Sequence, residues 1–390
     1  MQRKIIDLPA LPDDGRLYHD GALGMVESLL PNPWKSCHAP DLLELPGGDL
    51  LCCWFAGSWE GNADVSIAVS RLPAGASQWE EPVIVSDDPT RSEQNPSLFL
   101  NPDNGDVWLM YTAQKTPPPD LPKGVSMQGT AEIRRKISHD GGRSWDATET
   151  VFDRPGSFCR QKIQVLSSGR WVFSGFLCSM DNTRNGSDRS IVQISDDHGA
   201  TWRMVEIPAS AGRVHGNILE LSPGHLVCLL RSRFADHIYR AESFDEGETW
   251  SIPEPTGLRN NNASISAIKL HSGALAIIYN DVAFCDKPGE TLWPDQRCPV
   301  AIAISEDGGR TWPWRRIVEH GEGFIGPWND VNNGRYEYPI LMQSADGHLH
   351  AAYAWGRRTR IKYLCVDEAW VRGAKLCKGS EDDGVHFCLR

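Results

Sequence analysis

An eight-residue pattern repeated along the chain restricts its possible folds more than any other feature. The form S-x-D-x-G-x-x-W occurs in full four times, and a fifth stretch, from Ser70 to Trp79, keeps the strand and Trp but lacks the acidic turn. In this spacing the carboxylate can accept N–H groups of a tight turn, Gly takes positive φ, and Trp begins the returning strand. Each copy is therefore predicted to close a β-hairpin. The full copies are Ser138/Asp140/Gly142/Trp145, Ser195/Asp197/Gly199/Trp202, Ser243/Asp245/Gly247/Trp250 and Ser305/Asp307/Gly309/Trp312.

A second repeat consists of an apolar run, a turn that contains Gly, and another apolar run. The runs are short, rich in Leu, Val and Ile, and bounded by turn residues, which predicts β-hairpins rather than helices. Successive turn glycines are 49 to 74 residues apart, a period that suits a four-stranded blade with its loops. The six turn glycines are Gly48, Gly105, Gly169, Gly224, Gly273 and Gly347.

Together the repeats predict an all-β fold, a six-bladed β-propeller of four-stranded antiparallel blades, as a single domain over residues 1–390. The last module has no S-x-D-x-G-x-x-W copy after Tyr353. We therefore expect the N-terminal segment to supply its outer strand, because an open ring would expose unpaired strand edges. The proline-rich stretches 116–125 and 285–299 are too long for blade turns and are expected to cover one face.

Charge and hydropathy limit the possible partners. The formal net charge of −12 argues against a nucleic-acid partner, and no stretch is long and apolar enough for a membrane-spanning helix. The N-terminus lacks the apolar core of a secretion signal, so we expect a cytoplasmic protein, or a secreted one if a leader has been removed. The eleven cysteines show no C-x-x-C or zinc spacing and are expected to be mostly reduced core thiols.

No cofactor is expected, because no Gly-rich phosphate loop follows a strand. The Asp-rich turns leave a structural Ca²⁺ ion open.

Candidate functional residues follow from the geometry of a propeller, in which the inner strands surround the axis. The residues just before each apolar inner strand should converge on one mouth, and in all six modules they are polar. This predicts a polar site, although the same residues could satisfy strand-end backbone or line a water-filled channel. The candidates are His38, Asn95, Arg160, Gln161, Lys162, His215, Asn217, Asn261, Asn262, Glu337 and Tyr338.

The repeated motif resembles the Asp box of the sialidase superfamily, and the resemblance covers nearly the whole chain. In that family the Asp boxes lie on the outer rim, so the resemblance implies structural roles for the motif carboxylates. These are Asp140, Asp197, Asp245 and Asp307, which we exclude from the site.

The resemblance also implies chemistry. Sialidases hold a substrate carboxylate with three arginines and use a Tyr nucleophile assisted by Glu, with an Asp as acid/base. Tyr338, which opens the last inner strand, matches the place of the nucleophile, and Arg231 matches the second arginine. Glu60 and Asp64 occupy the region of the acid/base.

The chain departs from the family pattern at three places. His38-Ala39-Pro40 stands where the first arginine motif is expected, and His215 lies in the region of the glutamate. No residue matches the third arginine clearly, and Arg259 and Arg160 are the candidates.

Each candidate has a structural alternative. Arg231, with Arg160 or Lys162, could bind an acidic sugar, or Arg231 could pair with Asp236 or Glu242 on the rim. Tyr338 could be a nucleophile or an aromatic wall for a sugar ring. The two histidines, His38 and His215, suit proton transfer or simple strand-end hydrogen bonding.

The sequence therefore predicts a propeller enzyme that cleaves a terminal glycosidic bond of an acidic sugar, as a sialidase-like glycoside hydrolase with a small-molecule or oligosaccharide substrate. One alternative is a uronate β-eliminating lyase, such as a rhamnose–glucuronate lyase, in which His38 or His215 removes a proton. Another is a propeller that binds glycan or protein, or acts without hydrolysis, after losing sialidase chemistry.

Overall fold

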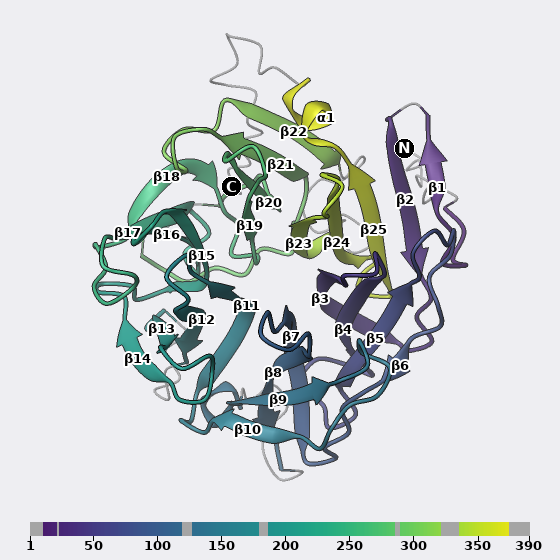
Figure 1. The fold of residues 1–390 in the computed structure, drawn as a ribbon, viewed down its shortest axis with the longest axis horizontal. Helices are drawn as coiled ribbons and strands as arrows, with labels where there is room; N and C mark the ends of the chain where they lie inside the picture. Colours follow the sequence, from purple (N-terminus) through teal and green to yellow (C-terminus); the bar gives the residue numbers. More distant parts are fainter. Residues whose placement is uncertain are drawn as a thin grey trace, which may run out of the picture.

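The computed structural model describes residues 11–21, 23–118, 127–178, 186–284, 289–320 and 335–373. Its strands form six antiparallel sheets arranged around a central axis (Figure 1). This confirms the predicted all-β, six-bladed propeller. The unplaced parts of the two proline-rich stretches, 119–125 and 285–288, lie outside the described residues.

Each blade runs from an inner strand at the axis to an outer strand at the rim. Blade 1 contains β3 (Ser36–Glu44), β4 (Leu50–Gly57), β5 (Ser66–Leu72) and β6 (Val83–Ile84). Blade 2 contains β7 (Arg91–Leu100), β8 (Val107–Lys115), β9 (Glu132–Ser138) and β10 (Glu149–Phe152). Blade 3 contains β11 (Ser157–Val165), β12 (Trp171–Leu177), β13 (Arg189–Ser195) and β14 (Arg203–Glu206).

The remaining blades follow the same order along the chain. Blade 4 contains β15 (Arg213–Ser222), β16 (His225–Ser232), β17 (His237–Ser243) and β18 (Glu254–Arg259). Blade 5 contains β19 (Ser266–Lys269), β20 (Leu275–Asn280), β21 (Val300–Ser305) and β22 (Trp314–Glu319). Blade 6 begins with β23 (Glu337–Gln343), β24 (Leu349–Trp355) and β25 (Arg360–Val366).

Blade 6 is completed from the other end of the chain. Strand β2 (Met25–Leu30) pairs antiparallel with β25, and β1 (Tyr18–Asp20) pairs with β2 outside it (Figure 1). The N-terminal strands thus occupy the edge that the last module leaves open, and no edge of β25 remains unpaired along this stretch.

The hydrophobic core lies between blades rather than within one layer. Each of the six largest clusters of buried apolar residues joins two neighbouring blades, for example Trp54 of blade 1 with Ala354 of blade 6. This arrangement arises because the strands are apolar on both faces, so that each sheet packs against a neighbour on either side. The blades are therefore held as one ring.

The Asp turns explain the periodic motif at atomic level. In the turn at Asp307, the carboxylate accepts hydrogen bonds from the Thr311 backbone N–H at 2.8 Å and from the Thr311 hydroxyl at 2.6 Å. The Ser305 hydroxyl donates to the same carboxylate at 2.8 Å and accepts from the N–H of Gly309, which has φ of 84°. The other three turns repeat these bonds, so each motif carboxylate is engaged in its own turn.

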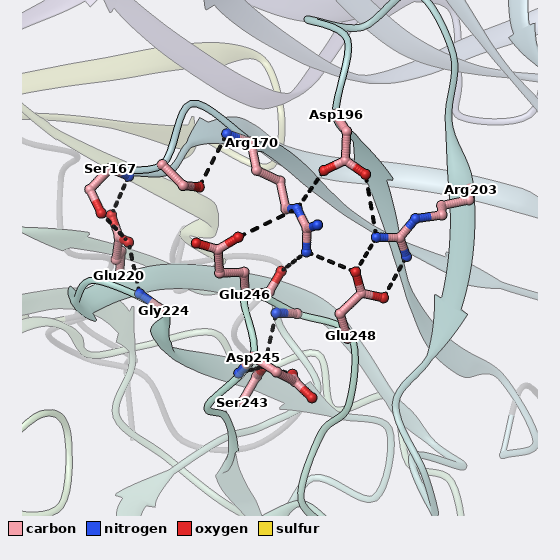
Figure 2. Close-up of polar contacts among 12 residues, drawn as sticks. Ser167, Arg170, Asp196, Arg203, Glu220, Gly224, Ser243, Asp245, Glu246 and Glu248 are labelled. Carbon is pink, nitrogen blue, oxygen red and sulfur yellow. Dashed lines mark hydrogen bonds and ion pairs between the residues drawn. The ribbon is translucent and has the colours of Figure 1, made fainter.

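Next to two of these turns, an ion-pair network joins the rims of blades 3 and 4 (Figure 2). Arg170 contacts Asp196 at 2.6 Å and Glu248 at 2.8 Å, and Glu248 also pairs with Arg203. Most of these groups are partly exposed. We assign this network to the blade contact, because every charge in it already has a partner of opposite sign.

Helices make up little of the described structure. The described residues contain a 3-10 helix (Gln128–Thr130) and one short α-helix, α1 (Glu368–Arg372), whose Trp370 indole donates to the carbonyl of Leu23. No helix among the placed residues has the length and apolarity to cross a bilayer. The eight cysteines in the described ranges are free thiols, and seven of them are buried.

Candidate active site

The candidate residues come to the axis because the inner strands are bulged there. Regular pairing is interrupted in β3, β7, β11, β15 and β23 at the position of the polar residue. Bulges of this kind redirect side chains and are common beside active sites. The strands thus extend through these polar residues, whereas the sequence analysis placed the residues before the strands.

Positive φ angles mark the same positions. Asn95, His215 and Tyr338 have φ of 50°, 53° and 53°, and Asn262, just before β19, has 61°. In blade 1 the residue in this conformation is Ala39, next to His38. Non-glycine residues in this region cost energy and cluster at functional sites. We call the group around the axis formed by His38, Arg160, His215, Arg231, Arg297, Glu337 and Tyr338 the hub.

Tyr338 is the central residue of the hub, and it remains partly exposed. Its hydroxyl accepts a hydrogen bond of 2.7 Å from Nη1 of Arg231. Burial by itself would raise the pKa of Tyr338, but the charges of Arg231 and Arg297 outweigh it, so the pKa lies below its usual value. The two arginines therefore make it easier for Tyr338 to ionise to the phenolate, the nucleophilic form of a tyrosine.

Arg231 is fully buried and is held by polar neighbours that carry no charge. Its Nε donates to Oδ1 of Asn262 at 2.9 Å, and its Nη1 lies 3.5 Å from Nε2 of His215. Burial lowers the pKa of Arg231 to about 10. These contacts exclude the alternative in which Arg231 pairs with Asp236 or Glu242 on the rim.

His215 stands beside Arg231 as a neutral base. Burial, and then the charge of Arg231, lower the pKa of His215 well below its usual value. Its Nδ1 lies 2.9 Å from the Ser264 hydroxyl. Because Nη1 of Arg231 can only donate, Nε2 is the acceptor, and we assign the ring proton to Nδ1. The charge of Arg231 is therefore not neutralised by this neighbour.

Glu337 anchors the cations on the other side of Tyr338. Its buried carboxylate lies 2.5 Å from Nε of Arg358, 2.8 Å from Nε of Arg335 and 3.7 Å from Nη1 of Arg297. Burial would raise the pKa of Glu337, but Arg358 and Arg297 hold it well below the usual range. Glu337 is therefore an ionised partner of arginines and not a proton donor.

His38 lies against the ring of Tyr338, with 4.2 Å between ring centroids and 3.5 Å from its Nδ1 to Oε2 of Glu337. Neither ring nitrogen has a hydrogen-bond partner among the described residues. Burial, followed by the charge of Arg358, lowers the pKa of His38 well below its usual value, so the imidazole is neutral near pH 7.

The guanidinium groups of Arg160, Arg231 and Arg297 surround the Tyr338 ring, with Cζ 5.8, 5.2 and 5.5 Å from its centroid. Arg160 donates to the carbonyls of Pro40 and Tyr338, at 3.0 and 3.2 Å. Each of the three guanidinium groups also has a buried N–H without an acceptor among the placed residues: Arg160 Nε and Nη1, Arg231 Nη2, and Arg297 Nε and Nη1. Buried donors of this kind call for an acceptor, and a carboxylate is the matching one.

The two carboxylate candidates for proton donation differ in their surroundings. Asp64 accepts bonds from the Ser58 N–H and hydroxyl, at 3.0 and 2.8 Å, and so holds its own loop. Glu60 lies 2.5 Å from Nη1 of Arg358, and its charge opposes that of the arginines at Tyr338. Glu60 therefore stands at the edge of the hub, and Asp64 organises the loop.

The other polar candidates form hydrogen bonds or ion pairs with neighbouring strands and loops. Lys162 contacts Asp41 at 2.8 Å, Gln161 donates to the Ile265 carbonyl, and Asn217 donates to the His215 carbonyl. Asn261 donates to the Gln296 carbonyl in the described part of the loop 285–299. Asn95 is buried and its carbonyl contacts the Cys159 thiol.

Sequence reasoning missed one hub arginine, Arg297, and one arginine beside the hub, Arg358. Arg297 lies in the loop before β21, and Arg358 lies in the turn after β24. Of the two candidates for a third arginine, Arg160 reaches Tyr338, whereas Arg259 pairs with Asp281 at 3.0 Å. The sequence feature that could have indicated Arg358 is the cluster of Arg357, Arg358 and Arg360 after the last hairpin.

No group of three or more His, Cys, Asp or Glu side chains in the placed part of the chain is arranged to hold a metal ion. The Ca²⁺ left open by the sequence stays a prediction.

Comparisons with known proteins agree with this architecture. The model of the BNR repeat-like domain matches residues 48–351. A sialidase of Micromonospora viridifaciens is 26% identical over 366 residues, which are 86% of this chain and 52% of the relative, so the chain spans about half that protein's length.

Solved structures of low identity share the fold. The Hadza microbial sialidase Hz136 superimposes with a TM-score of 0.69 at 18% identity, over 87% of this chain and 67% of the other. A leech intramolecular trans-sialidase gives 0.67 at 15% identity, over 87% and 69%. With the family model matching most of its length, the chain belongs to the BNR repeat-like family of sialidase-like β-propellers.

Proposed function

We propose that this protein is a glycoside hydrolase that releases a terminal acidic sugar, of the sialic or uronic acid type. The observation that carries the proposal is the set of buried guanidinium N–H groups without a hydrogen-bond acceptor that surround the ring of Tyr338. Those donors suit a substrate carboxylate, and Tyr338 is then placed beside the sugar that bears it. The 26% identity to a sialidase supports the same class of reaction.

In the proposed reaction, Arg160, Arg231 and Arg297 hold the carboxylate. The Tyr338 oxygen forms a bond to the anomeric carbon as the bond to the leaving oxygen breaks. That oxygen takes a proton from Glu60, which must first be protonated by solvent and leave its ion pair with Arg358. Water then hydrolyses the tyrosyl–sugar bond and restores both groups. The positive charge of the hub stabilises the phenolate of Tyr338 before attack. Because His215 is neutral, it does not neutralise the charge of Arg231.

The test is to incubate the protein with sialosides and uronate-terminated oligosaccharides and to measure the released acidic sugar. We expect Tyr338→Phe to lower kcat by about 10³-fold or more, as for loss of a nucleophile, without unfolding the protein. Tyr18→Phe is the matched control, because it removes a hydroxyl bonded to Asp14 at 2.7 Å, outside the hub. Full activity of Tyr338→Phe would reject the mechanism.

A β-eliminating lyase is the second candidate, and it is favoured by the neutral His38 with two unpartnered ring nitrogens. In that reaction His38 removes the proton next to the uronate carboxylate, the bond to the leaving oxygen breaks as a double bond forms, and Tyr338 gives that oxygen a proton. The ultraviolet absorbance of a conjugated double bond identifies this product, and its absence alongside released sugar identifies hydrolysis. If neither product forms, the result would favour a propeller that binds its ligand without turnover.

A further inference from the structure

A cleft of about 280 Å³ lies beside the hub, between the loop after β4 and the turn after β24. Its lining includes the basic side chains of Lys35, Arg335, Arg357 and Arg358 and the indole of Trp59, and it includes no acidic side chain. The volume lies close to the lower end of the range for small-molecule sites, roughly 300 Å³. Arg335 and Arg358 already pair with three carboxylates, those of Asp295, Glu337 and Glu60, so the four cations of the cleft exceed these carboxylates by one. The cleft therefore suits a single sugar ring that carries negative charge.

The cleft adjoins the proposed reaction centre through Arg358. This guanidinium lies 2.5 Å from Glu337 of the hub and 2.5 Å from Glu60. Since Glu60 is the proposed donor to the leaving oxygen, the leaving group must lie on the Glu60 side of the scissile bond. The cleft is on that side, because Ser58 and Trp59, which precede Glu60, line it.

The turn that supplies the arginines has an unfavourable backbone. Gly356, Arg357 and Arg358 follow one another with φ of 59°, 58° and 67°. Glycine or asparagine suits such positions, whereas a long side chain there costs energy. The turn is fixed to blade 1 by the Cys37 N–H, which donates to the Arg358 carbonyl at 2.6 Å. In this strained turn Arg358 pairs with Glu337 and Glu60, and Arg357 adds a second cation to the lining of the cleft.

Trp59 supplies an apolar surface at the same place. It is 59% exposed, which is unusual for an indole, and it lines the cleft together with the basic groups. An aromatic face beside cations is the chemistry that receives a sugar ring bearing an acidic group, because the ring stacks and the acid pairs with the arginines.

We propose that this cleft binds an anionic sugar residue on the leaving-group side of the substrate, so that the protein acts on a glycan with acidic groups on both sides of the cleaved bond. The inference rests on the proposed function for the order of the two sugars, while binding in the cleft is measured without turnover. A carboxylate and a sulfate ester would both supply the charge, and separate probes distinguish them.

The experiment measures binding of methyl β-D-glucuronide, glucose 6-sulfate and neutral methyl β-D-glucoside by titration calorimetry. We expect an anionic probe to bind at least tenfold more tightly than the glucoside, with the preferred probe showing which acidic group is recognised. Arg357→Asn should weaken that probe at least tenfold and keep or raise the melting temperature, because asparagine accepts positive φ. Trp59→Ala should weaken the anionic and the neutral sugars alike.

Two controls separate the cleft from the hub. Arg189→Gln removes a positive charge from blade 3, where Arg189 is 47% exposed, and should leave affinity unchanged. Arg231→Gln weakens the carboxylate site of the hub and should remove any binding of the probe there, while the binding that depends on Arg357 should remain. Loss of binding in Arg231→Gln but not in Arg357→Asn would place the anion in the hub and overturn the inference.

Equal binding of glucuronide, sulfate and glucoside, or binding of none of them, would also overturn the inference. The proposed hydrolase would stand in either case if sialosides are cleaved. Conversely, failure to cleave any acidic glycoside, with Arg357-dependent binding intact, would reject the hydrolase and keep the anionic-sugar site.

Discussion

At the residue scale, burial and charge act on Tyr338 in opposite directions. A buried phenol is normally harder to ionise, yet the pKa of Tyr338 is lowered because Arg231 and Arg297 stand next to it. The same burial lowers the pKa values of His38 and His215 and keeps both rings neutral. The hub thus combines a tyrosine that ionises readily with two uncharged imidazoles.

This leads to a prediction for the titration of Tyr338. Subtracting the ultraviolet tyrosinate titration of Tyr338→Phe from that of the wild type should give one phenol with a pKa below the ordinary 10.0. In Arg231→Gln the pKa of this phenol should rise, because the nearest positive charge is lost. The ionised form is favoured in the folded state, so this group adds stability as pH rises toward 10 and loses it as pH falls through the lowered pKa. An unchanged pKa in Arg231→Gln would contradict the account.

The sequence could locate Tyr338, His38 and His215 because they lie at corresponding places in periodic inner hairpins, and a closed ring brings those places to one axis. Arg231 was located by its match to the second arginine of the sialidase pattern. The sequence could not locate Arg297 or Arg358, since their positions depend on the path of a loop and on a strained turn, neither of which is periodic. The bulges in the inner strands also could not be predicted, because a bulge inserts a residue without changing the apolar pattern around it.

At the element scale, the Asp turns stabilise hairpins at the strand ends away from the hub. Ser305 lies opposite Leu275, where β20 begins, whereas Asn280 at the other end of β20 lies toward the hub. Four repeated turns could be predicted from sequence in detail because every bond in them is local, within five residues. The network of Arg170, Arg203 and Glu248 could not, because its partners come from two blades (Figure 2).

Removing one turn carboxylate should therefore lower stability without changing chemistry. Asp307→Ala leaves the N–H groups of Arg310 and Thr311 without their acceptor, and we expect a loss of about 1–3 kcal/mol in the free energy of unfolding. Urea denaturation measures this loss. Glu306→Ala is the neighbouring control, because Glu306 is 59% exposed and its ion pair with Arg372 should contribute less than about 1 kcal/mol.

The same turn predicts a dependence on acid. Burial would raise the pKa of Asp307, but hydrogen bonds from Thr311 and Ser305 lower it from 3.8 to about 2. Because the folded state holds the carboxylate ionised, this stabilisation is present above pH 3.8 and is lost as pH falls toward 2. The difference in unfolding free energy between wild type and Asp307→Ala should narrow over that interval. A constant difference would show that the charge of Asp307 plays no part.

At the scale of the whole molecule, stability depends on closing the ring with strand β2. Its consecutive residues Leu29 and Leu30 point to opposite faces of blade 6 and enter the two different cores on either side of it. One strand from the N-terminus therefore joins blade 6 to both neighbours, and every blade has a packed partner on each face. Hub residues from blades 1, 3, 4, 5 and 6 meet only in a closed ring, so closure also sets the geometry around Tyr338.

Weakening the closure should accordingly affect both stability and the hub. Leu29→Ala and Leu30→Ala should each cost about 2–5 kcal/mol in unfolding free energy, since both side chains are buried. Leu23→Ala, at a residue 43% exposed just before β2, should change it by no more than about 0.5 kcal/mol. Because the two core leucines face separate clusters, their losses of unfolding free energy should add in the double variant. In that variant the titration of Tyr338 should broaden or shift as the hub loosens. A double variant as stable as wild type would mean that the remaining strands hold the ring without β2, and that the position of Tyr338 beside Arg231 is fixed within the blades rather than by their closure.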